Sequence, residues 1–269
     1  NILESIYVGT IGKSHRTNDT SDMLMFNAEE AGIVVKFEKK DTPQKVNIKL
    51  FRQGPKDIRL NDTKISQKEL IGTLNTVIFC PEDLQLIKGT PSGRRRFLDM
   101  EISQTSATYY HQLMQYNRLL QQRNVILKEY RGKQNIPLEE WDLQLADMAS
   151  FIVKKRLESL KKINLLIDLM NRKLTGGLEN LTIGYEQPYM DNGSLEYTKE
   201  GFYERIKAAL PQDRHRMTTS VGPHRDDLRF FSDAMDLKKF GSQGQQRTAV
   251  LSLKLSELEF IKSEVGEYP

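Results

Sequence analysis

The chain has 269 residues, of which 38% are hydrophobic and 28% are charged, so it can bury a sizeable core as one large α/β unit or as two lobes. No apolar run reaches the roughly 18 residues of a membrane helix and no signal peptide precedes the first polar residues, which predicts a cytoplasmic protein without membrane contact. The single cysteine, Cys80, excludes an internal disulfide, and the formal net charge of +4 permits nucleic-acid binding without requiring it.

The first part of the chain predicts a short helix followed by an antiparallel meander. Residues 1–8 have a helical pattern of apolar residues, although no capping residue precedes them. Strand-like alternation follows in three stretches, which turn residues separate: 32–38, 45–51 and 57–61. One face of this sheet is expected to contact water, because Lys45, Asn47 and Lys49 lie on the same side.

A brief apolar run at residues 76–80, after a short helix at 66–74, predicts a buried strand. The strand would end at Pro81, where a loop begins. Ligands of α/β sheets commonly bind in loops at the carboxyl ends of strands, so this loop is a candidate ligand contact.

The middle of the chain predicts an all-α lobe. Residues 94–128 and 138–174 contain no Pro or Gly and carry apolar residues at helical intervals, which favours an antiparallel helical pair or bundle. Two basic clusters of this lobe are candidate DNA contacts: Arg94, Arg95 and Arg96, and Lys154, Lys155 and Arg156. A solvated helix face is the more common explanation of the second cluster. The first cluster opposes the helix dipole, so it invites an anionic partner.

A strand at residues 181–186 is expected to return to the sheet, and a helix at 197–210 is expected to end at Pro211. The segment 220–230 then forms a dense polar loop between apolar elements.

This polar loop contains one histidine beside two aspartates, but we do not expect a metal site. Asp226 and Asp227 are neighbours, and neighbouring side chains on a strand point to opposite faces. His224 and Arg225 are better interpreted as groups that face a phosphate or form salt bridges.

The most informative motif is Gly-Ser-Gln-Gly-Gln-Gln-Arg-Thr at residues 241–248. Gly241 and Gly244 bracket Ser242 and Gln243, so the backbone can take positive φ values and a ligand can approach its N–H groups. The helix that follows would place unpaired N–H groups and the positive end of its dipole beside the Ser242 hydroxyl, an arrangement that binds phosphate. The alternative is that Ser242 or Gln243 only caps a core helix.

The helix after this motif is expected to be mostly buried. Leu251, Leu255 and Leu258 fall at i, i+4 and i+7, and three further residues widen the apolar stripe: Val250, Leu253 and Ile261. Residues 266–269 then predict a helix end and a proline stop. Because a helix that stops so cleanly normally leads into another element, and because the first helix lacks a cap, we expect a fragment of a longer protein.

Four motifs in order resemble the RecF family, bacterial recombinational-repair ATPases related to the ABC and SMC head domains. They lie at residues 13–17, 79–99, 222–228 and 241–248, and the resemblance covers essentially the whole chain. It implies an α/β fold, an ABC-type ATPase head that contains a mixed sheet with an antiparallel meander and carries an inserted all-α helical lobe. Three consecutive parts are expected: 1–90 and 178–269 as the two halves of the ATPase lobe, and 91–177 as the helical lobe.

The resemblance also implies a slow ATPase that uses ATP and Mg²⁺. The family's P-loop and Walker B aspartates would lie just outside the two ends, so no catalytic residue is identified here and the chain alone is expected to be inactive. The signature residues would contact ATP bound to a second head: Gly241, Ser242, Gln243, Gly244 and Gln245. Pro81, His224 and Arg225 are expected near the nucleotide. The loop at Pro81 matches the position of the Q-loop but lacks its glutamine.

The implied function is DNA repair, recombination and replication within the SOS response, by an ATP-dependent homodimer that clamps gapped DNA. Single-strand/double-strand DNA junctions would be the substrate, RecR and RecO the partners, and RecA the recombinase that is loaded. The alternative is a basic module that binds nucleic acid or protein and does not use ATP.

Overall fold

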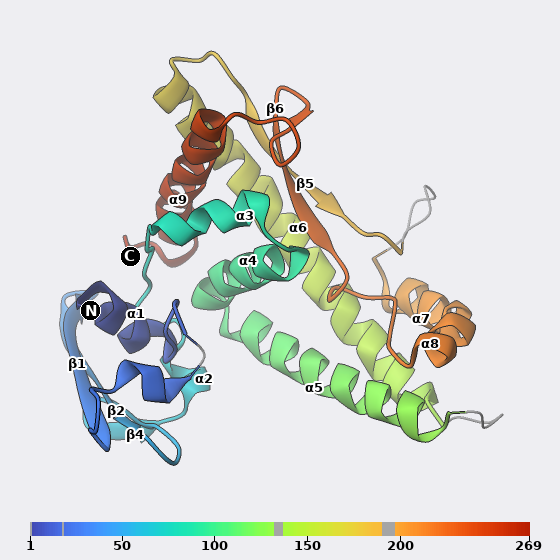
Figure 1. The fold of residues 1–269 in the computed structure, drawn as a ribbon, viewed down its shortest axis with the longest axis horizontal. Coiled ribbons are helices and arrows are strands. Elements are labelled where there is room, and N and C mark those ends of the chain that lie inside the picture. The colour runs from blue at the N-terminus through green and yellow to red at the C-terminus, as the bar shows by residue number, and fades with distance from the viewer. Residues whose placement is uncertain (1, 18, 132–136, 190–196) are drawn as a thin grey trace. The chain divides into compact units, whose positions relative to one another are not determined.

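The computed structural model describes residues 2–17, 19–131, 137–189 and 197–269 (Figure 1). The chain forms two compact units. The first comprises Asn1–Cys80, Ser103–Ala107 and Glu257–Pro269, and the second comprises Pro81–Ile102 and Thr108–Ser256. The units therefore group the residues differently from the three consecutive parts expected from the sequence, since most of the third part joins the helical residues.

The first unit contains short helices and a four-stranded antiparallel sheet in the order β1-β2-β3-β4. Its elements are α1 (Ile2–Ile11), η1 (Thr20–Met23), β1 (Glu30–Lys39), β2 (Thr42–Phe51), β3 (Asp57–Leu60), β4 (Thr63–Ile65) and α2 (Gln67–Leu70). Val35 of β1 pairs with Val46 of β2, and Ile48 of β2 pairs with Ile58 of β3. The predicted meander is confirmed, and β4 extends it.

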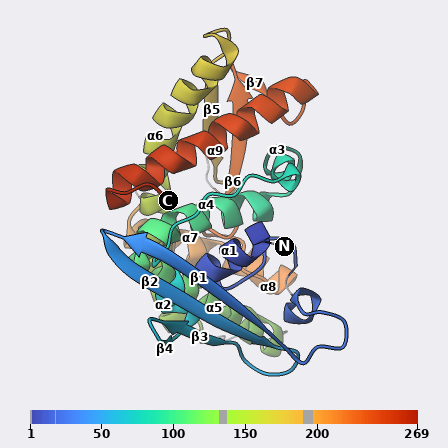
Figure 2. The same ribbon diagram turned by 90° about the vertical axis from the view of Figure 1, so that its left-hand side faces the viewer.

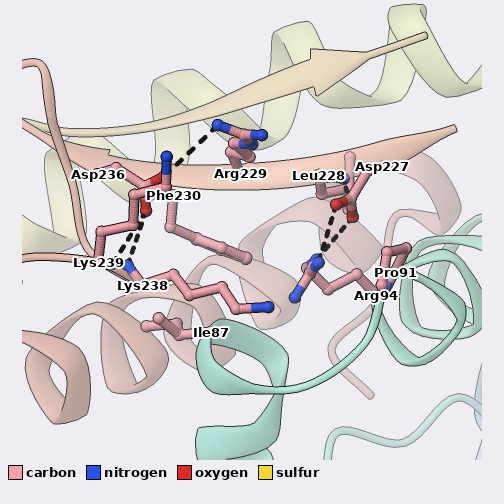
Figure 3. Close-up of a pocket in the computed structure, with 10 residues that line it drawn as sticks. All are labelled: Ile87, Pro91, Arg94, Asp227, Leu228, Arg229, Phe230, Asp236, Lys238 and Lys239. Atoms are coloured by element: carbon pink, nitrogen blue, oxygen red, sulfur yellow. Dashed lines mark hydrogen bonds and ion pairs between the residues drawn. The ribbon is translucent and has the colours of Figure 1, made fainter. Parts of the chain in front are cut away.

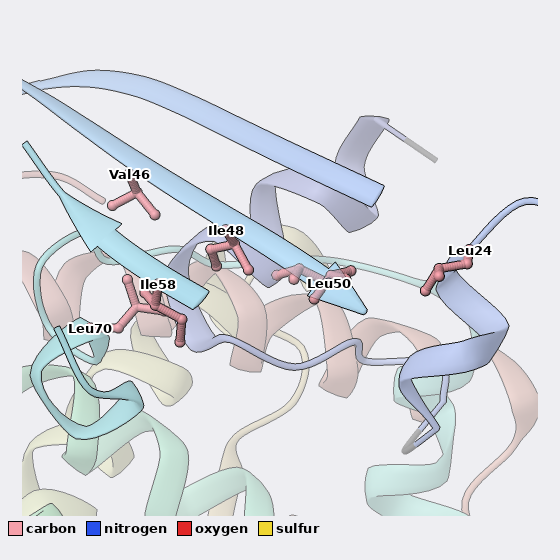
Figure 4. Packing of buried hydrophobic residues seen from close by; sticks show 7 residues of the cluster. Leu24, Val46, Ile48, Leu50, Ile58 and Leu70 are labelled. Carbon is pink, nitrogen blue, oxygen red and sulfur yellow. The ribbon is translucent and has the colours of Figure 1, made fainter. Parts of the chain in front are cut away.

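The core of this unit lies against one face of the sheet (Figure 4). Val46, Ile48 and Leu50 of β2 are buried, whereas Lys49 between them is exposed. The buried cluster also contains Val8 of α1, Leu24 just after η1, Ile58 of β3 and Leu70 of α2. A strict alternation of apolar and polar residues along β2 therefore fixes which face packs inward.

The strand predicted at residues 76–80 is wrong. These residues form no regular element, and Phe79 is 57% exposed. The Thr76 N–H donates to Gln104 Oε1 at 2.9 Å, so a side chain takes the place of a ladder partner for this group. In the described part of the chain the sheet of this unit is made only of β1 to β4, and an apolar run without a neighbouring strand does not complete its backbone hydrogen bonds by pairing.

The second unit packs helices around a three-stranded antiparallel sheet in the order β5-β6-β7. Its elements are η2 (Pro81–Leu84), α3 (Gln85–Lys88), most of α4 (Pro91–Thr105), α5 (Ala107–Glu129), α6 (Glu139–Thr175), β5 (Leu181–Glu186), α7 (Lys199–Ala208), α8 (Leu210–Arg216), β6 (Asp227–Ser232), β7 (Met235–Asp236) and the first part of α9 (Gln243–Val265). The predicted long helix at 138–174 and the predicted strand at 181–186 are confirmed as α6 and β5. The expectation that this strand returns to the first sheet is wrong, because β5 pairs with β6, and residues 227–230 of the predicted polar loop belong to β6.

Helix α6 contacts both the sheet and α9 in this unit. Its Asn164 side chain binds both backbone groups of Ile183 on β5, accepting from the N–H at 2.7 Å and donating to the carbonyl at 3.0 Å. Helix α9 crosses the distal part of α6 (Figure 2), where Ser252 Oγ lies 3.1 Å from Asn171 Oδ1. Helix α6 therefore covers the edge of the sheet and supports α9, which begins within residues 241–248, the signature motif.

Two helix boundaries differ from the prediction. The stretch 94–128 is not one helix, because α4 ends at Thr105 and α5 begins at Ala107, separated by Ser106. Serine favours helix N-termini over helix interiors. Pro211 does not end a helix but lies in the first turn of α8, where its missing N–H costs nothing.

The predicted buried stripe of α9 is also shifted. Leu251 is 37% exposed, and Leu255 and Leu258 are half-buried. The buried face instead carries the residues predicted only to widen the stripe, namely Val250, Leu253 and Ile261, together with small hydroxyl residues. Ser252 and Ser256 are buried because each donates to a carbonyl of its own helix, Thr248 and Leu253 respectively.

Glu101 of α4 is a buried carboxyl whose pKa burial raises to about 7, although Lys254 nearby opposes the shift and Asp83 adds to it. We expect the free energy of unfolding of the wild-type chain to fall as the pH rises from 4.5 to 7, because the folded state holds a proton on Glu101 that the unfolded state releases. Relative to wild type, Glu101→Gln should be more stable at pH 8 than at pH 5, with a difference of roughly 2–3 kcal/mol. Urea unfolding at both pH values measures this. The exposed control Glu204→Gln should show no such difference, and equal pH profiles for wild type and Glu101→Gln would contradict the assignment.

Candidate functional site

The signature motif begins with a backbone turn that only glycine can occupy. Gly241 donates its N–H to Leu237 O at 3.2 Å, and a Cβ on Gly241 would lie 2.6 Å from that carbonyl oxygen. Gln246 Nε2 donates to the same oxygen at 2.7 Å and fixes the turn from the first helical turn of α9. Neither Gly241 nor Gly244 has a positive φ, so Gly241 is required by close approach rather than by the backbone conformation expected from the sequence.

Ser242 caps α9 and is exposed. Its hydroxyl accepts from the Gln245 N–H at 3.2 Å, while its own N–H donates to Gln245 Oε1 at 2.9 Å. This reciprocal pair is a capping box, so the capping interpretation of the motif is correct. Ser242 can still bind a phosphate, because a serine hydroxyl that accepts one hydrogen bond keeps its proton to donate to a phosphate oxygen.

The start of α9 is strongly positive. Lys238, Lys239 and Arg247 are exposed around the cap, and the helix dipole adds to their field. Gln245 Nε2 donates to Glu179 Oε1 at 2.9 Å, so the Gln245 amide lies between this carboxylate and the Ser242 N–H, to which its oxygen is bonded. Ser242, the flanking N–H groups and these cations form an open site for a phosphate oxygen.

A pocket of about 350 Å³ lies beside this site, between α4, β6 and the turn that leads to α9 (Figure 3). Arg94 and Lys238 approach each other from opposite sides of it, and both donate to Gly89 O, at 2.9 and 2.8 Å. Arg94 is also held by two bonds to Asp227, at 2.7 and 2.8 Å. The Gly89 carbonyl and the Asp227 carboxylate thus anchor the segment before α9 to the start of α4.

Two of the predicted DNA contacts are structural instead. Arg94 is 3% exposed because of its pairing with Asp227. Arg156 is 2% exposed, and it pairs with both oxygens of Asp99 at 2.9 Å while donating to Pro223 O at 2.7 Å. Arginines that are buried and fully engaged with carboxylates are not available to phosphates.

The other basic candidates differ in how accessible they are. Arg95 is half-buried and donates to Asp226 O at 2.6 Å. Lys155 forms a surface pair with Glu158 at 2.7 Å, and Arg96 and Lys154 are exposed. Arg96 and Lys154 are therefore accessible to an anion, and Lys155 is accessible where its surface pair with Glu158 opens.

The residues predicted near the nucleotide lie in different surroundings. Both ring nitrogens of His224 are engaged, Nδ1 with Tyr116 Oη at 2.6 Å and Nε2 with Thr219 O at 3.0 Å, and burial lowers its pKa to about 4. His224 is therefore neutral at physiological pH and positions the loop rather than supplying charge. Arg225 and Pro81 are exposed, and Pro81 begins η2.

The sequence analysis missed two arginine networks that hold the helices to the polar loop. Arg123 is fully buried and bridges Asp142 at 2.6 Å and Asp213 at 2.7 Å. Arg156 does the same for Asp99 and Asp226. A signal was available, because Arg123 falls seven residues after the buried Tyr116, on the buried stripe of α5. A charge on a core-facing stripe predicts an internal partner of opposite sign.

The residues present fit part of an ATP site. Ser242 and the start of α9 suit a phosphate oxygen, whereas the described residues contain no group of three or more His, Cys, Asp or Glu side chains that could hold a metal ion. In the described part of the chain, no helix has the length and apolar character needed to span a membrane.

Comparison with known proteins gives one family. The chain is 44% identical to a DNA replication and repair protein RecF of Alkaliphilus oremlandii over 272 residues, covering 100% of the chain and 74% of that protein. It is 44% identical over 270 residues to a RecF of Clostridium botulinum, again over 100% of the chain and 74% of the relative. No protein-family model matches the chain.

Solved structures of the recombination mediator protein RecF in the RecFOR pathway have the same fold. The form named RecF-ATP superposes with a TM-score of 0.93 at 34% identity, covering 100% of the chain and 73% of that structure. The form named RecF-ATPrS gives a TM-score of 0.92 at 33% identity over the same shares. The predicted fold class, helices and antiparallel sheets with a helical region, is confirmed.

Proposed function

The chain belongs to the RecF family of DNA replication and repair proteins, and we propose that the start of its α9 completes an ATP site held by a second RecF head. Gly241, Ser242, Gln243, Gly244 and Gln245 form the contact surface. The Ser242 hydroxyl and the first N–H groups of α9 donate to the γ-phosphate, and the nearby lysines offset its charge.

The exposed capping serine carries this proposal. Ser242 is held in place by its bonds to Gln245, so its hydroxyl is positioned before any ligand arrives. A preorganised donor loses little freedom on binding. Since the bonds to ATP form only when two heads meet, ATP stabilises the homodimer and hydrolysis releases it.

DNA binding is the second part of the proposal. Arg96, Lys154 and Lys155 provide phosphate contacts on the helical part of the chain, and such contacts give affinity that depends on salt and little on sequence. We keep the expected division into 1–90, 91–177 and 178–269 as a proposal about how the ATPase lobe and helical lobe share these tasks.

The remaining elements of the proposal come from the family. Mg²⁺ accompanies ATP and is held by residues other than those described here. Single-strand/double-strand junctions are the DNA substrate, RecR and RecO are the partners, and RecA is loaded as a result, in the cytoplasm. Pro81 and Arg225 lie near the nucleotide of the assembled dimer, with His224 as the residue that supports the loop.

The test is DNA affinity with and without Mg-ATP, measured by fluorescence anisotropy on a labelled junction. It uses the extended chain, meaning this chain lengthened at both ends to the full length of its curated relatives. Because a dimer engages DNA through two surfaces, Mg-ATP should tighten binding at least about tenfold. Equal affinity under both conditions would overturn the proposal and favour a basic interaction module that does not use ATP.

A further inference from the structure

A second pocket of the helical unit has an unusual charge. It has a volume of about 400 Å³, and its polar lining consists of Tyr189, Arg205, Gln212, Arg216, Ser220 and Arg225. No aspartate or glutamate of the described chain lines it. Three guanidinium groups therefore share one cavity that has no carboxylate among the described residues of its wall.

The three arginines are held by neutral oxygens. Arg205 Nη1 donates to Tyr189 O at 2.8 Å. Arg225 donates to Thr219 O through Nε at 3.0 Å and Nη2 at 2.6 Å. Both Nη atoms of Arg216 lie 3.2 Å from the Gln212 amide oxygen when that oxygen faces the guanidinium. These bonds orient the side chains, and none of them brings a negative charge to the guanidinium groups.

Two carboxylates close in sequence to Arg216 and Arg225 bind other groups, and Glu204, which precedes Arg205, is exposed and does not line the pocket. Asp226, which follows Arg225, accepts from Tyr185 and faces Arg156 at 3.4 Å. Asp213 of α8 is fully buried, where it pairs with Arg123 at 2.7 Å and accepts from the Ser220 hydroxyl and N–H. Arg123 and Arg156 pair with carboxylates, whereas no described carboxylate pairs with the three pocket arginines.

We propose that this arginine pocket, formed by Arg205, Arg216 and Arg225, binds a phosphate group, and that a DNA strand supplies it. Planar guanidinium groups match the oxygens of a phosphate in pairs, and three of them offset its charge. The cavity is large enough for a phosphate with part of its sugar. This inference rests on the proposed DNA binding and adds a phosphate site distinct from Arg96, Lys154 and Lys155.

The experiment compares the wild-type chain with the triple variant Arg205→Gln/Arg216→Gln/Arg225→Gln. The control Lys161→Gln/Lys199→Gln/Lys207→Gln also loses three positive charges. Its three lysines are exposed, belong to the same unit and lie outside the pocket. Anisotropy of a labelled junction from 50 to 300 mM salt should show about tenfold weaker binding for the arginine variant than for the control. Its salt slope should be lower than that of wild type by about one.

Calorimetric titration with inorganic pyrophosphate separates the possible sources of the phosphate. Loss of both DNA affinity and pyrophosphate binding in the arginine variant supports the proposal. Loss of pyrophosphate binding alone, with DNA affinity unchanged, overturns the DNA source in favour of a free anion. If neither changes, the pocket is not a phosphate site.

One further variant and one further outcome keep the interpretations separate. The single variant Arg216→Gln changes an exposed side chain that, among the described residues, is held through Gln212. It should therefore fold and still show part of the loss if the triple variant does not fold. If the wild-type chain binds pyrophosphate through these arginines but does not bind DNA, the proposed DNA binding fails together with the DNA source, while the anion pocket stands.

Discussion

Arg156→Met is expected to lower the free energy of unfolding by roughly 3–5 kcal/mol, the cost of removing one partner from a buried ion-pair network. Arg156 of α6 joins three separate segments, since it pairs with Asp99 of α4 and with Asp226 and Pro223 of the polar loop. Without the guanidinium, Asp99 and Asp226 keep their tyrosine donors, Tyr109 and Tyr185, and lose the positive charge that balances them. Burial already raises the pKa of Asp226, which Arg156 opposes.

Urea unfolding followed by circular dichroism measures this loss. Lys155→Met is the control, because Lys155 precedes Arg156 on the same helix and forms only a surface pair with Glu158; its effect should stay within about 0.5 kcal/mol. Adding Asp99→Asn to Arg156→Met should recover part of the stability, because it removes one of the unpaired charges. A loss of less than about 1 kcal/mol for Arg156→Met would show that the network is not needed for the fold.

Ser242→Arg is expected to abolish the ATP-driven association of the extended chain. The substitution removes the hydroxyl, disturbs the capping box with Gln245 and places a long side chain where a nucleotide on the second head must approach. DNA binding by the monomer should change little, because Ser242 lies outside the candidate DNA contacts. Light scattering with increasing Mg-ATP measures association, and anisotropy without nucleotide measures DNA binding.

The matched control is Ser263→Arg, which introduces the same side chain at an exposed serine near the other end of α9. Ser263 donates only to Phe260 O of its own helix, so this variant should associate like wild type. If Ser242→Arg weakened DNA binding as much as association, or if the control lost association too, the assignment of Ser242 would be wrong.

Local patterns in the sequence predicted most of the fold. Alternation along residues 32–61 gave the meander, because each strand pairs with its neighbour in sequence and buries one face. The Pro- and Gly-free stretch at 138–174 gave α6 for the same local reason. Residues 76–80 could not be assigned this way, because an apolar run becomes a strand only if other strands are there to pair with it.

The sequence likewise predicted one part of the candidate site and missed another. The capping motif at Ser242 depends on residues three apart, so the sequence contains the whole arrangement. The roles of Arg94 and Arg156 depend on Asp227 and Asp99, which lie 133 and 57 residues away. A basic cluster on a helix does not show whether its charges face solvent or a distant carboxylate, and here one member of each cluster is buried. The arginine pocket was missed because its three arginines are spread over α7, α8 and the polar loop.

The most direct test of the ATP-dependent account is sedimentation velocity of the extended chain with and without Mg-ATP, beside this chain under the same conditions. The account predicts that Mg-ATP shifts the extended chain from monomer to dimer and leaves this chain unchanged, since only the former would carry both halves of the ATP site. If the extended chain sediments as the same species in both conditions, the start of α9 does not complete a site on a second head, and the ATP-driven dimer is wrong.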